Sequence, residues 1–446
     1  MPARRFVSSL TGEATLAKTV SVKRRFLLVF LQACICQKTP SPAEPAADAA
    51  LGAATFDEVV AEPGGLSAPI AATRADHGGV YVAGIDVAAK TIRVQRLDAD
   101  GKVLADRTVL DGATWSSESD LKVSQAAGGA AITWRGKRNG KLVRQLVVVG
   151  PDLVPKGDPI AIAAASCATE DALWSTDGKR AERHPWMGKQ TKIELQKDED
   201  TSIVCGPRRA YALVETNEGT SIVVLGADAG TKRMPLLEDS TFGEDEPREH
   251  AEYTVGDVFG VVRFAASGAI AVRELGGPMH RLKAKIPTDS DVVAVDGTVK
   301  QLVIVYTEDA AESCDGGTSA KVLALRIDRT NFDESLVEIS PGSCGREAGP
   351  FFTGALGESL SVAWVERIPV HGSTKAPVEG LAHRVVTPVG ALPALVRTSK
   401  AADTLVDAGC DGVHCFAVAL ARHALVPGVD AGKFGPPGFA QVLRYP

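Results

Sequence analysis

Aromatic residues and the motifs of several enzyme classes are scarce or absent in this sequence. Only 5% of the 446 residues are aromatic, whereas 44 are glycine. The sequence contains no Gly-x-Ser-x-Gly elbow, no phosphate-cradling glycine loop and no His-Glu-x-x-His motif, so these signals of enzymatic chemistry are missing. Small, β-branched and turn-forming residues dominate instead, and they suit a chain of many short strands.

The chain also lacks the charge pattern of a nucleic-acid-binding protein. Its formal net charge is −6, although residues 1–33 hold six basic side chains against the single acid Glu13. The remainder of the chain is therefore clearly acidic. Polyanion binding requires clustered Lys and Arg that displace counterions, and we find no stretch that combines such a cluster with aromatic residues. We expect no nucleic-acid partner.

Signals for metal or catalytic sites are weak as well. The eight histidines do not recur in register with any repeat, so we interpret them as surface or loop residues. The acidic segments 197–200 and 243–252 lack the Asp-x-Asp-x-Asp-Gly order of a calcium loop, and we interpret them as solvated loops. The sequence therefore predicts no catalytic, cofactor-binding or metal-binding residue, and no cofactor.

What does recur is a two-strand pattern. Gln301–Tyr306 is a continuous apolar run, typical of a strand buried on both faces, and Lys321–Ile327 alternates like a half-buried neighbour. About eight such hairpins follow one another at intervals of roughly 40–60 residues, which is typical of sheets stacked around an axis. We predict an all-β fold: a single β-propeller of about eight, alternatively seven, four-stranded blades.

Seven further hairpins complete this repeat. Their paired segments are Val80–Ile85 and Ile92–Leu97, Ala130–Trp134 and Leu142–Val149, Ala172–Ser175 and Thr191–Leu195, Ala210–Glu215 and Ser221–Leu225, Val258–Phe264 and Ala269–Leu275, Ser359–Val365 and Ala382–Val386, and Cys415–Ala421 and Phe439–Arg444.

Turn residues and tryptophans support the repeat. Asn139-Gly140 is the strongest hairpin signal, because both central positions of a type I′ turn need positive φ. Trp134, Trp174 and Trp364 lie near the end of the first strand of their hairpins. Aromatic residues at a repeated position usually pack, so we predict that these three fill the space between neighbouring blades.

A propeller must close, because an open ring exposes a sheet edge. The last hairpin has a preceding candidate strand at Thr404–Val406, and the chain then stops at Pro446, so that blade lacks a strand. Phe56–Ala61 is a short strand candidate that lies ahead of the first hairpin. We predict that Phe56–Ala61 pairs beside Phe439–Arg444 and joins the two chain ends.

The first 54 residues have the character of a leader and a tether. Lys23-Arg24-Arg25 precedes the apolar run Phe26–Leu31, which is too short to span a bilayer. The following Leu31-Gln32-Ala33-Cys34 resembles the lipobox of bacterial lipoproteins, which implies cleavage before Cys34 and acylation of that residue; Gln32 replaces the usual small or aliphatic residue. A plain export signal, or a segment without a targeting role, is the alternative.

These features divide the chain into three parts. Residues 1–33 form a lipoprotein-type signal peptide, residues 34–54 a tether and residues 55–446 the propeller domain. The tether is rich in Pro and Ala, and its composition cannot bury enough apolar surface to order itself. We expect a lipid-anchored protein on the periplasmic or outer surface of a bacterial envelope, or alternatively a secreted one.

Apart from Cys34 and Cys36, six cysteines remain, an even number that favours disulfides in an exported chain. Proximity in sequence suggests Cys167 with Cys205, Cys314 with Cys344, and Cys410 with Cys415, although six cysteines allow 15 pairings. Zinc is the weaker interpretation of Cys410 and Cys415, because their spacing has no second half elsewhere.

Two short segments resemble motifs of sialidases, which are propeller enzymes. Arg367-Ile368-Pro369 is similar to part of their arginine motif, and Ser175-Thr176-Asp177-Gly178 to their aspartate box. The resemblance would imply glycoside hydrolysis. In that family, however, the arginine motif opens the first blade, whereas here it lies late in the chain, and the box lacks its following Gly and aromatic residue.

The sequence thus predicts a non-catalytic binding or scaffold protein that presents a β-propeller. We expect a monomer with a protein or glycan partner, and contact with the membrane through the lipid anchor only. The alternative is a propeller hydrolase or lyase that acts on an extracellular glycan or peptide, with acids contributed by Asp and Glu side chains in the funnel.

Overall fold

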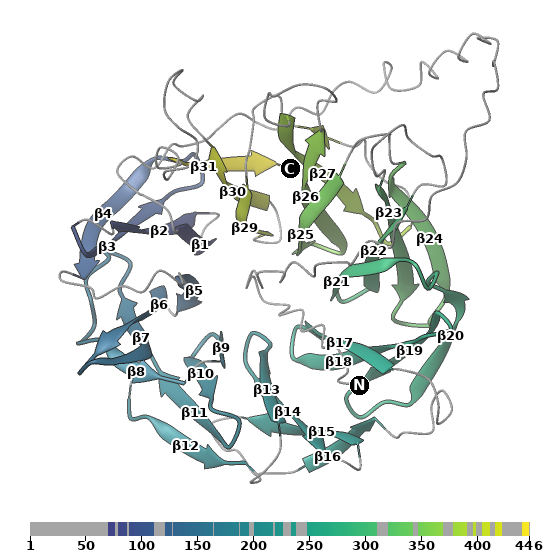
Figure 1. The fold of residues 1–446 in the computed structure, drawn as a ribbon, viewed down its shortest axis with the longest axis horizontal. Coiled ribbons are helices and arrows are strands. Elements are labelled where there is room, and N and C mark those ends of the chain that lie inside the picture. Colours follow the sequence, from purple (N-terminus) through teal and green to yellow (C-terminus); the bar gives the residue numbers. More distant parts are fainter. Residues whose placement is uncertain are drawn as a thin grey trace, which may run out of the picture.

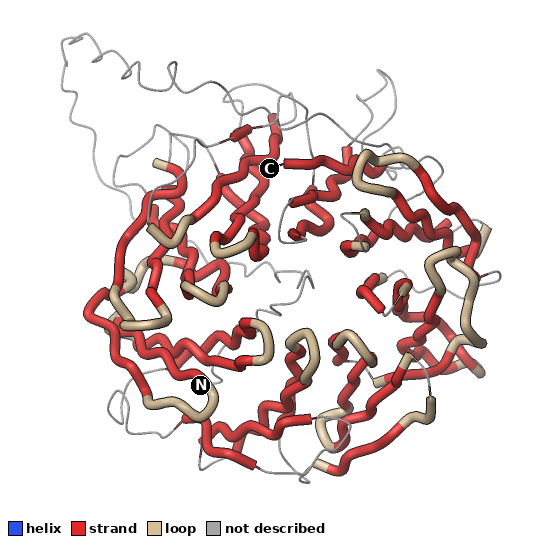
Figure 2. Tube along the Cα trace, turned by 180° about the vertical axis from the view of Figure 1, so that it is seen from behind, coloured by secondary structure: helices blue, strands red, loops and turns tan. Residues whose placement is uncertain are grey.

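The structure is a computed structural model. It describes residues 70–75, 79–86, 89–110, 121–126, 128–163, 165–186, 188–195, 200–216, 219–225, 233–237, 248–309, 320–341, 347–368, 378–389, 396–397, 404–410, 415–421 and 439–445. Every regular element within these residues is a strand (Figure 2). The fold is all-β, as predicted.

The described strands form eight antiparallel sheets, in which sequence neighbours pair. The first four sheets are β1 (Ile70–Arg74), β2 (Val80–Asp86), β3 (Thr91–Leu97), β4 (Val103–Leu110); β5 (Lys122–Ala126), β6 (Gly129–Arg138), β7 (Lys141–Val149), β8 (Ile160–Ile162); β9 (Ala165–Ala168), β10 (Ala172–Thr176), β11 (Arg180–Pro185), β12 (Thr191–Glu194); and β13 (Asp200–Cys205), β14 (Ala210–Thr216), β15 (Gly219–Leu225), β16 (Arg233–Leu237).

The other four continue the series. They are β17 (Arg248–Val255), β18 (Val258–Ala265), β19 (Ala269–Glu274), β20 (Met279–Lys285); β21 (Asp291–Gly297), β22 (Gln301–Asp309), β23 (Ala320–Asp328), β24 (Glu334–Ser340); β25 (Glu347–Leu356), β26 (Ser359–Ile368), β27 (Val378–Val386), β28 (Val396–Arg397); and β29 (Thr404–Cys410), β30 (Cys415–Ala421), β31 (Phe439–Tyr445).

The sheets stand side by side around a central axis, which is the arrangement of a β-propeller (Figure 1). Each predicted hairpin lies in a separate sheet, where it supplies the second and third strands, except in the third sheet. There the sequence pattern missed β11, because Arg180–Pro185 is largely polar. It also missed the first strand of most sheets, because these segments show no clear alternation of apolar and polar residues.

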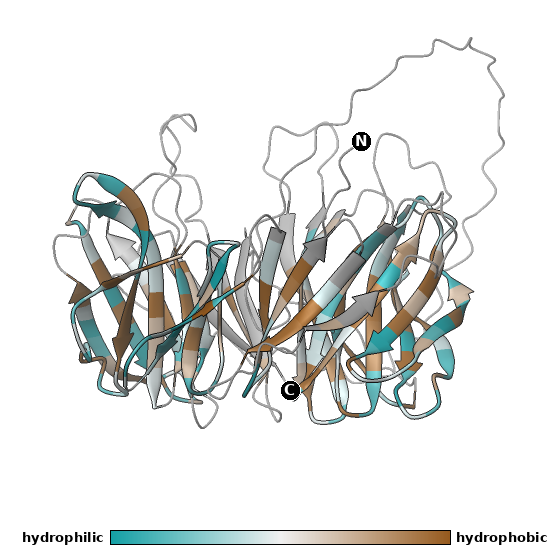
Figure 3. Cartoon of the chain, turned by 90° about the horizontal axis from the view of Figure 1, so that it is seen from below, coloured by the Kyte–Doolittle hydropathy of each residue, from teal (hydrophilic) through white to brown (hydrophobic). Residues whose placement is uncertain are grey.

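Apolar clusters fill the space between neighbouring sheets. Along β22, Leu302, Ile304 and Tyr306 pack toward the fifth sheet, whereas Val303 and Val305 pack toward the seventh. Such a strand is buried on both faces, which explains its continuous apolar run. Seen from the side, the strands cross a flat disc (Figure 3).

The first strands of all sheets end on the same side of this disc, which we call the turn end. There the Glu170 amide donates to the Pro207 carbonyl, and Thr298 Oγ1 donates to the Glu358 carbonyl at 2.9 Å, so turns of successive sheets are joined. The second and third strands of each sheet meet on the opposite side, which we call the hairpin end.

The predicted packing of the tryptophans is confirmed. Trp134, Trp174 and Trp364 are at most 2% exposed, and each lies in a cluster shared by two sheets. A comparable close contact involves Gly260, whose backbone lies under the ring of Tyr253: a Cβ at this position would be 2.2 Å from Tyr253 Cζ. Only glycine fits there.

Two predicted disulfides are present. Cys167–Cys205 links β9 to β13, the innermost strands of the third and fourth sheets, and Cys410–Cys415 links two directly paired residues of β29 and β30. Cys314 and Cys344 lie outside the described residues, so their pairing stays a prediction.

The leader, the tether and the strand candidate Phe56–Ala61 also lie outside the described residues. The eighth sheet has three described strands, with β31 at its outer edge. At the seam between the eighth and first sheets, Phe416 and Val418 pack with Ile70, Val80 and Val82. Arg74 Nη1 donates to the Cys410 carbonyl at 3.3 Å, and Arg74 Nε donates to Gln125 Oε1 at 2.9 Å.

Candidate functional site

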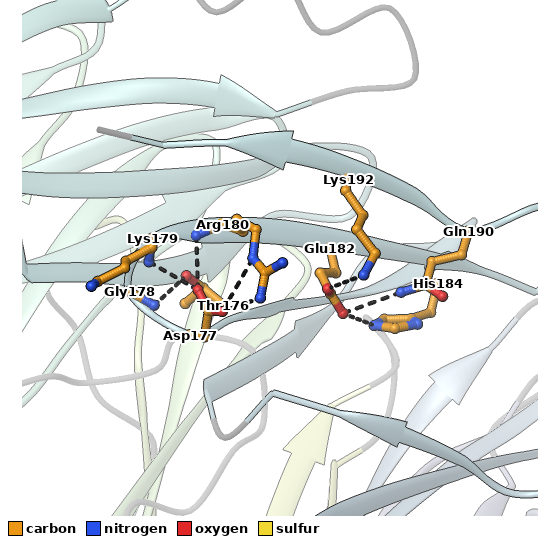
Figure 4. A network of polar contacts seen from close by, with 9 residues as sticks. All are labelled: Thr176, Asp177, Gly178, Lys179, Arg180, Glu182, His184, Gln190 and Lys192. Atoms are coloured by element: carbon orange, nitrogen blue, oxygen red, sulfur yellow. Dashed lines mark hydrogen bonds and ion pairs between the residues drawn. The ribbon is translucent and has the colours of Figure 1, made fainter. Parts of the chain in front are cut away.

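A polar network lies on the third sheet (Figure 4). Across the β10–β11 pair, Ser175 lies opposite Glu182 and Leu173 opposite His184. Side chains alternate along a strand, so these four residues share one face. Leu173 packs against Ala131 and Leu146 of the second sheet, which places the polar residues in the interface between the two sheets.

Serine, histidine and carboxylate lie close together in this network. Ser175 Oγ is 3.0 Å from His184 Nε2, and Glu182 Oε2 is 3.8 Å from the same nitrogen. Lys192 Nζ is 2.9 Å from Glu182 Oε1, and Gln190 Nε2 donates to Glu182 Oε2 at 3.1 Å. These are the residue types of a hydrolytic triad.

The geometry does not match a triad. A catalytic carboxylate accepts a hydrogen bond from Nδ1 while Nε2 faces the serine, but here both Ser175 and Glu182 approach Nε2. Nδ1 of His184 has no hydrogen-bond partner among the described residues. The side chain of His184 is 2% exposed and Ser175 is fully buried, so no substrate reaches the hydroxyl.

Burial also controls the charge of His184. Desolvation lowers its pKa, and Lys192 acts in the same direction, whereas Glu182 partly opposes them. The imidazole is therefore neutral at neutral pH, which removes the cost of a buried charge. We conclude that this network is a polar contact among the strands of the third sheet, on the face toward the second sheet, with the ion pair Glu182–Lys192 beside it.

The segment similar to a sialidase aspartate box is the β10–β11 turn. Asp177 Oδ1 accepts hydrogen bonds from the amides of Lys179 at 3.0 Å and Arg180 at 2.8 Å. The Arg180 guanidinium, whose Nη2 is 2.9 Å from Asp177 Oδ2, lowers the pKa of Asp177 to about 2. Turn formation accounts for these residues. Arg367, from the other segment, belongs to the end of β26.

A second network joins the fifth and sixth sheets at the turn end. Arg329 Nε donates to Glu274 Oε1 at 2.6 Å, and Arg329 Nη1 donates to the Thr298 carbonyl at 3.0 Å. The Tyr253 hydroxyl lies 3.4 Å from Glu274 Oε1. Burial raises the pKa of Tyr253, so the phenol stays protonated and donates. All three side chains are used in contacts between sheets.

Several expectations about charged residues need correction. Glu252 belongs to β17 rather than to a solvated loop, and it is 1% exposed, with Oε1 3.3 Å from His250 Nε2. His184 and His383 are buried in strands rather than on the surface; burial lowers the pKa of His383 to about 3. A polar residue at a buried strand position looks the same in the sequence as one in an exposed loop. The sequence therefore carries no signal that these residues are buried.

One cavity among the described residues is small. Its volume is about 20 Å³, and it lies between the fifth and sixth sheets and is lined by Glu249, Ala251, Phe264 and residues 292–295. This volume accommodates about one water molecule. Among the described residues, no group of three or more His, Cys, Asp or Glu side chains could hold a metal ion. No helix in the described part is long and apolar enough to cross a membrane.

No protein-family model and no curated protein matches the sequence. Solved structures similar to it include Hsv2 of Kluyveromyces lactis, at 12% identity over 58% of this chain and 82% of that chain, with a TM-score of 0.34. Hydrazine synthase of Kuenenia stuttgartiensis is 12% identical over 69% of this chain and 95% of that chain, with a TM-score of 0.39.

A prolyl endopeptidase is 10% identical over 72% of this chain, with a TM-score of 0.40, and this chain spans 57% of its length. The structural neighbours are β-propeller proteins, some of which are enzymes and others binding proteins. At these identities and scores, the likeness carries no argument about activity, substrate or partner.

Asp296 is buried and accepts a hydrogen bond from the Gly297 amide at 2.7 Å. Desolvation raises its pKa from 3.8 to about 6, against the opposing effects of Gly297 and the Thr353 side chain. The folded state therefore binds this proton more tightly than the unfolded chain, and ionisation destabilises the fold as pH rises from about 4 to above 6.

We predict that Asp296→Asn raises the free energy of unfolding at pH 8 by up to about 3 kcal/mol and leaves it nearly unchanged at pH 4. Urea unfolding at the two pH values measures this. The control, Asp177→Asn, should show the opposite sign at pH 8, because the pKa of Asp177 is lowered in the folded state. Equal effects of Asp296→Asn at both pH values would contradict the assignment.

Proposed function

We propose that this chain is a non-catalytic binding or scaffold protein that presents a β-propeller at a bacterial envelope. The observation that carries the proposal is the arrangement of Ser175, His184 and Glu182. These three side chains have the chemistry of a hydrolase, but Ser175 and His184 are buried and the geometry is unproductive. A propeller of this kind offers its loops and ends for recognition, while the sheets provide a rigid support.

The enzymatic alternative predicts a reactive serine, which a fluorophosphonate probe detects. We expect no labelling of Ser175 in the native protein, because its hydroxyl is buried and lacks an activated base. Intact mass and peptide mapping after incubation with the probe measure this, with Ser175→Ala as the control. Stoichiometric label on native wild type that is lost in Ser175→Ala would overturn the non-catalytic proposal.

We propose further that the ring is closed and has eight blades. The apolar contacts of Phe416 and Val418 with the first sheet, and the hydrogen bond from Arg74 to the Cys410 carbonyl, support closure. The edge position of β31 is compatible with Phe56–Ala61 as the fourth strand. The eight residues between this segment and β1 reach at most about 26–29 Å when extended, enough to cross three strand spacings.

The anchor is proposed from the leader alone. Acylation at Cys34, followed by a tether ending at residue 54, would hold the ring near a membrane without fixing its orientation. We expect a palmitate analogue supplied to cells to label the wild-type protein and not Cys34→Ala. Label on both proteins, or on neither, would refute the lipoprotein assignment; a shortened, unlabelled protein free in the periplasm or medium would indicate plain secretion.

A further inference from the structure

The second sheet has a charge pattern unlike that of the whole chain. Residues 121–149 contain six basic side chains and no acidic one, in a protein whose net charge is −6. Lys122 is on β5. The other five are grouped on the β6–β7 hairpin: Arg135, Lys137, Arg138, Lys141 and Arg144. The negative net charge of the whole chain conceals this local excess of positive charge.

The end of this hairpin continues past the strands on either side of it. Among the described residues, β6 pairs with β5 only as far as Thr133, and β7 pairs with β8 only from Arg144 onward. The two strands pair with each other to the last position, Arg138 opposite Lys141. Residues 134–143 therefore form a two-stranded ribbon at the hairpin end, with a length of roughly 15 Å.

The tip of the ribbon is a tight turn that is basic and partly apolar. Asn139 and Gly140 have φ values of 52° and 75°, the two positive angles of the predicted type I′ turn. Lys137, Arg138 and Lys141 are exposed, and neither Arg138 nor Lys141 forms an ion pair with a described residue. Leu142, beside them, is 47% exposed.

The two faces of the ribbon both carry charge. Arg138 and Lys141 lie opposite each other on one face, and the next pair, Lys137 and Leu142, lies on the other. A flat or cylindrical polyanion would contact one face only. A layer of anionic headgroups surrounds an inserted tip on all sides, and it also accepts a leucine at its apolar boundary.

We propose that the β6–β7 hairpin inserts tip-first among the anionic headgroups of a phospholipid bilayer and orients the ring with its hairpin end toward the membrane. The proposal rests on the proposed location at an envelope, and it adds a second membrane contact to the expected lipid anchor. Each basic residue near such a surface raises partitioning about fivefold at low salt, so the tip is suited to orient a tethered protein.

The test compares three versions of the full chain, all with Cys34→Ala so that acylation contributes nothing. Cosedimentation with phosphatidylglycerol vesicles or phosphatidylcholine vesicles measures partitioning at low ionic strength. We expect binding to phosphatidylglycerol only. Arg138→Glu with Lys141→Glu should lower it at least about tenfold. The matched control, Lys102→Glu with Lys156→Glu, changes the same charge on the first and second sheets at the turn end and should leave binding unchanged.

Equal loss in both double variants, or no loss in Arg138→Glu with Lys141→Glu, would overturn the proposal. Tip-dependent binding to duplex DNA without binding to phosphatidylglycerol vesicles would overturn it in favour of a polymer partner. Unchanged melting of the double variants verifies that they fold. Failure of palmitate labelling would refute the anchor but not the tip contact, whereas vesicle binding independent of the tip would refute the tip contact but not the anchor.

Discussion

The structure depends on the burial of both faces of each sheet by its neighbours. β22 illustrates this constraint, because alternate residues of the strand enter two different apolar clusters. Each such side chain contributes about 1.5–3 kcal/mol when fully removed from water, as an upper estimate. A single sheet with two apolar faces would not be stable alone, so stability belongs to the ring of contacts between sheets (Figure 1).

Polar residues in these interfaces have a structural role for the same reason. Ser175 Oγ and His184 Nε2 lie 3.0 Å apart within the third sheet, and Glu182 contacts His184 and Lys192 beside them (Figure 4). Arg329 with Glu274 joins the fifth and sixth sheets. Buried polar groups must be paired to avoid a desolvation cost, so the contact between Arg329 and Glu274 favours one relative placement of these two sheets. Residues available for recognition are therefore those at the ends of the disc, such as the β6–β7 tip.

The sequence predicts the hairpins well and the site poorly. Continuous apolar runs such as Gln301–Tyr306, and turns such as Asn139-Gly140, carry local signals that need no tertiary information. β11 was missed because its largely polar residues hide the strand period, and Glu252 was assigned to a loop because acidity alone suggests solvation. The basic hairpin was overlooked for a different reason: the net charge averages over regions of opposite sign, whereas a surface responds to the charge nearest to it.

Closure of the ring is the central claim, because each sheet needs a neighbour on both of its faces. An open seam would leave one face of each of two sheets without that neighbour. Comparing the melting temperatures of two truncated proteins tests it most directly. Deletion of residues 55–62 should lower the melting temperature of the whole domain, since it removes the strand proposed to pair beside β31, whereas deletion of residues 38–52 should not. Identical melting of the two truncated proteins would contradict the closed ring.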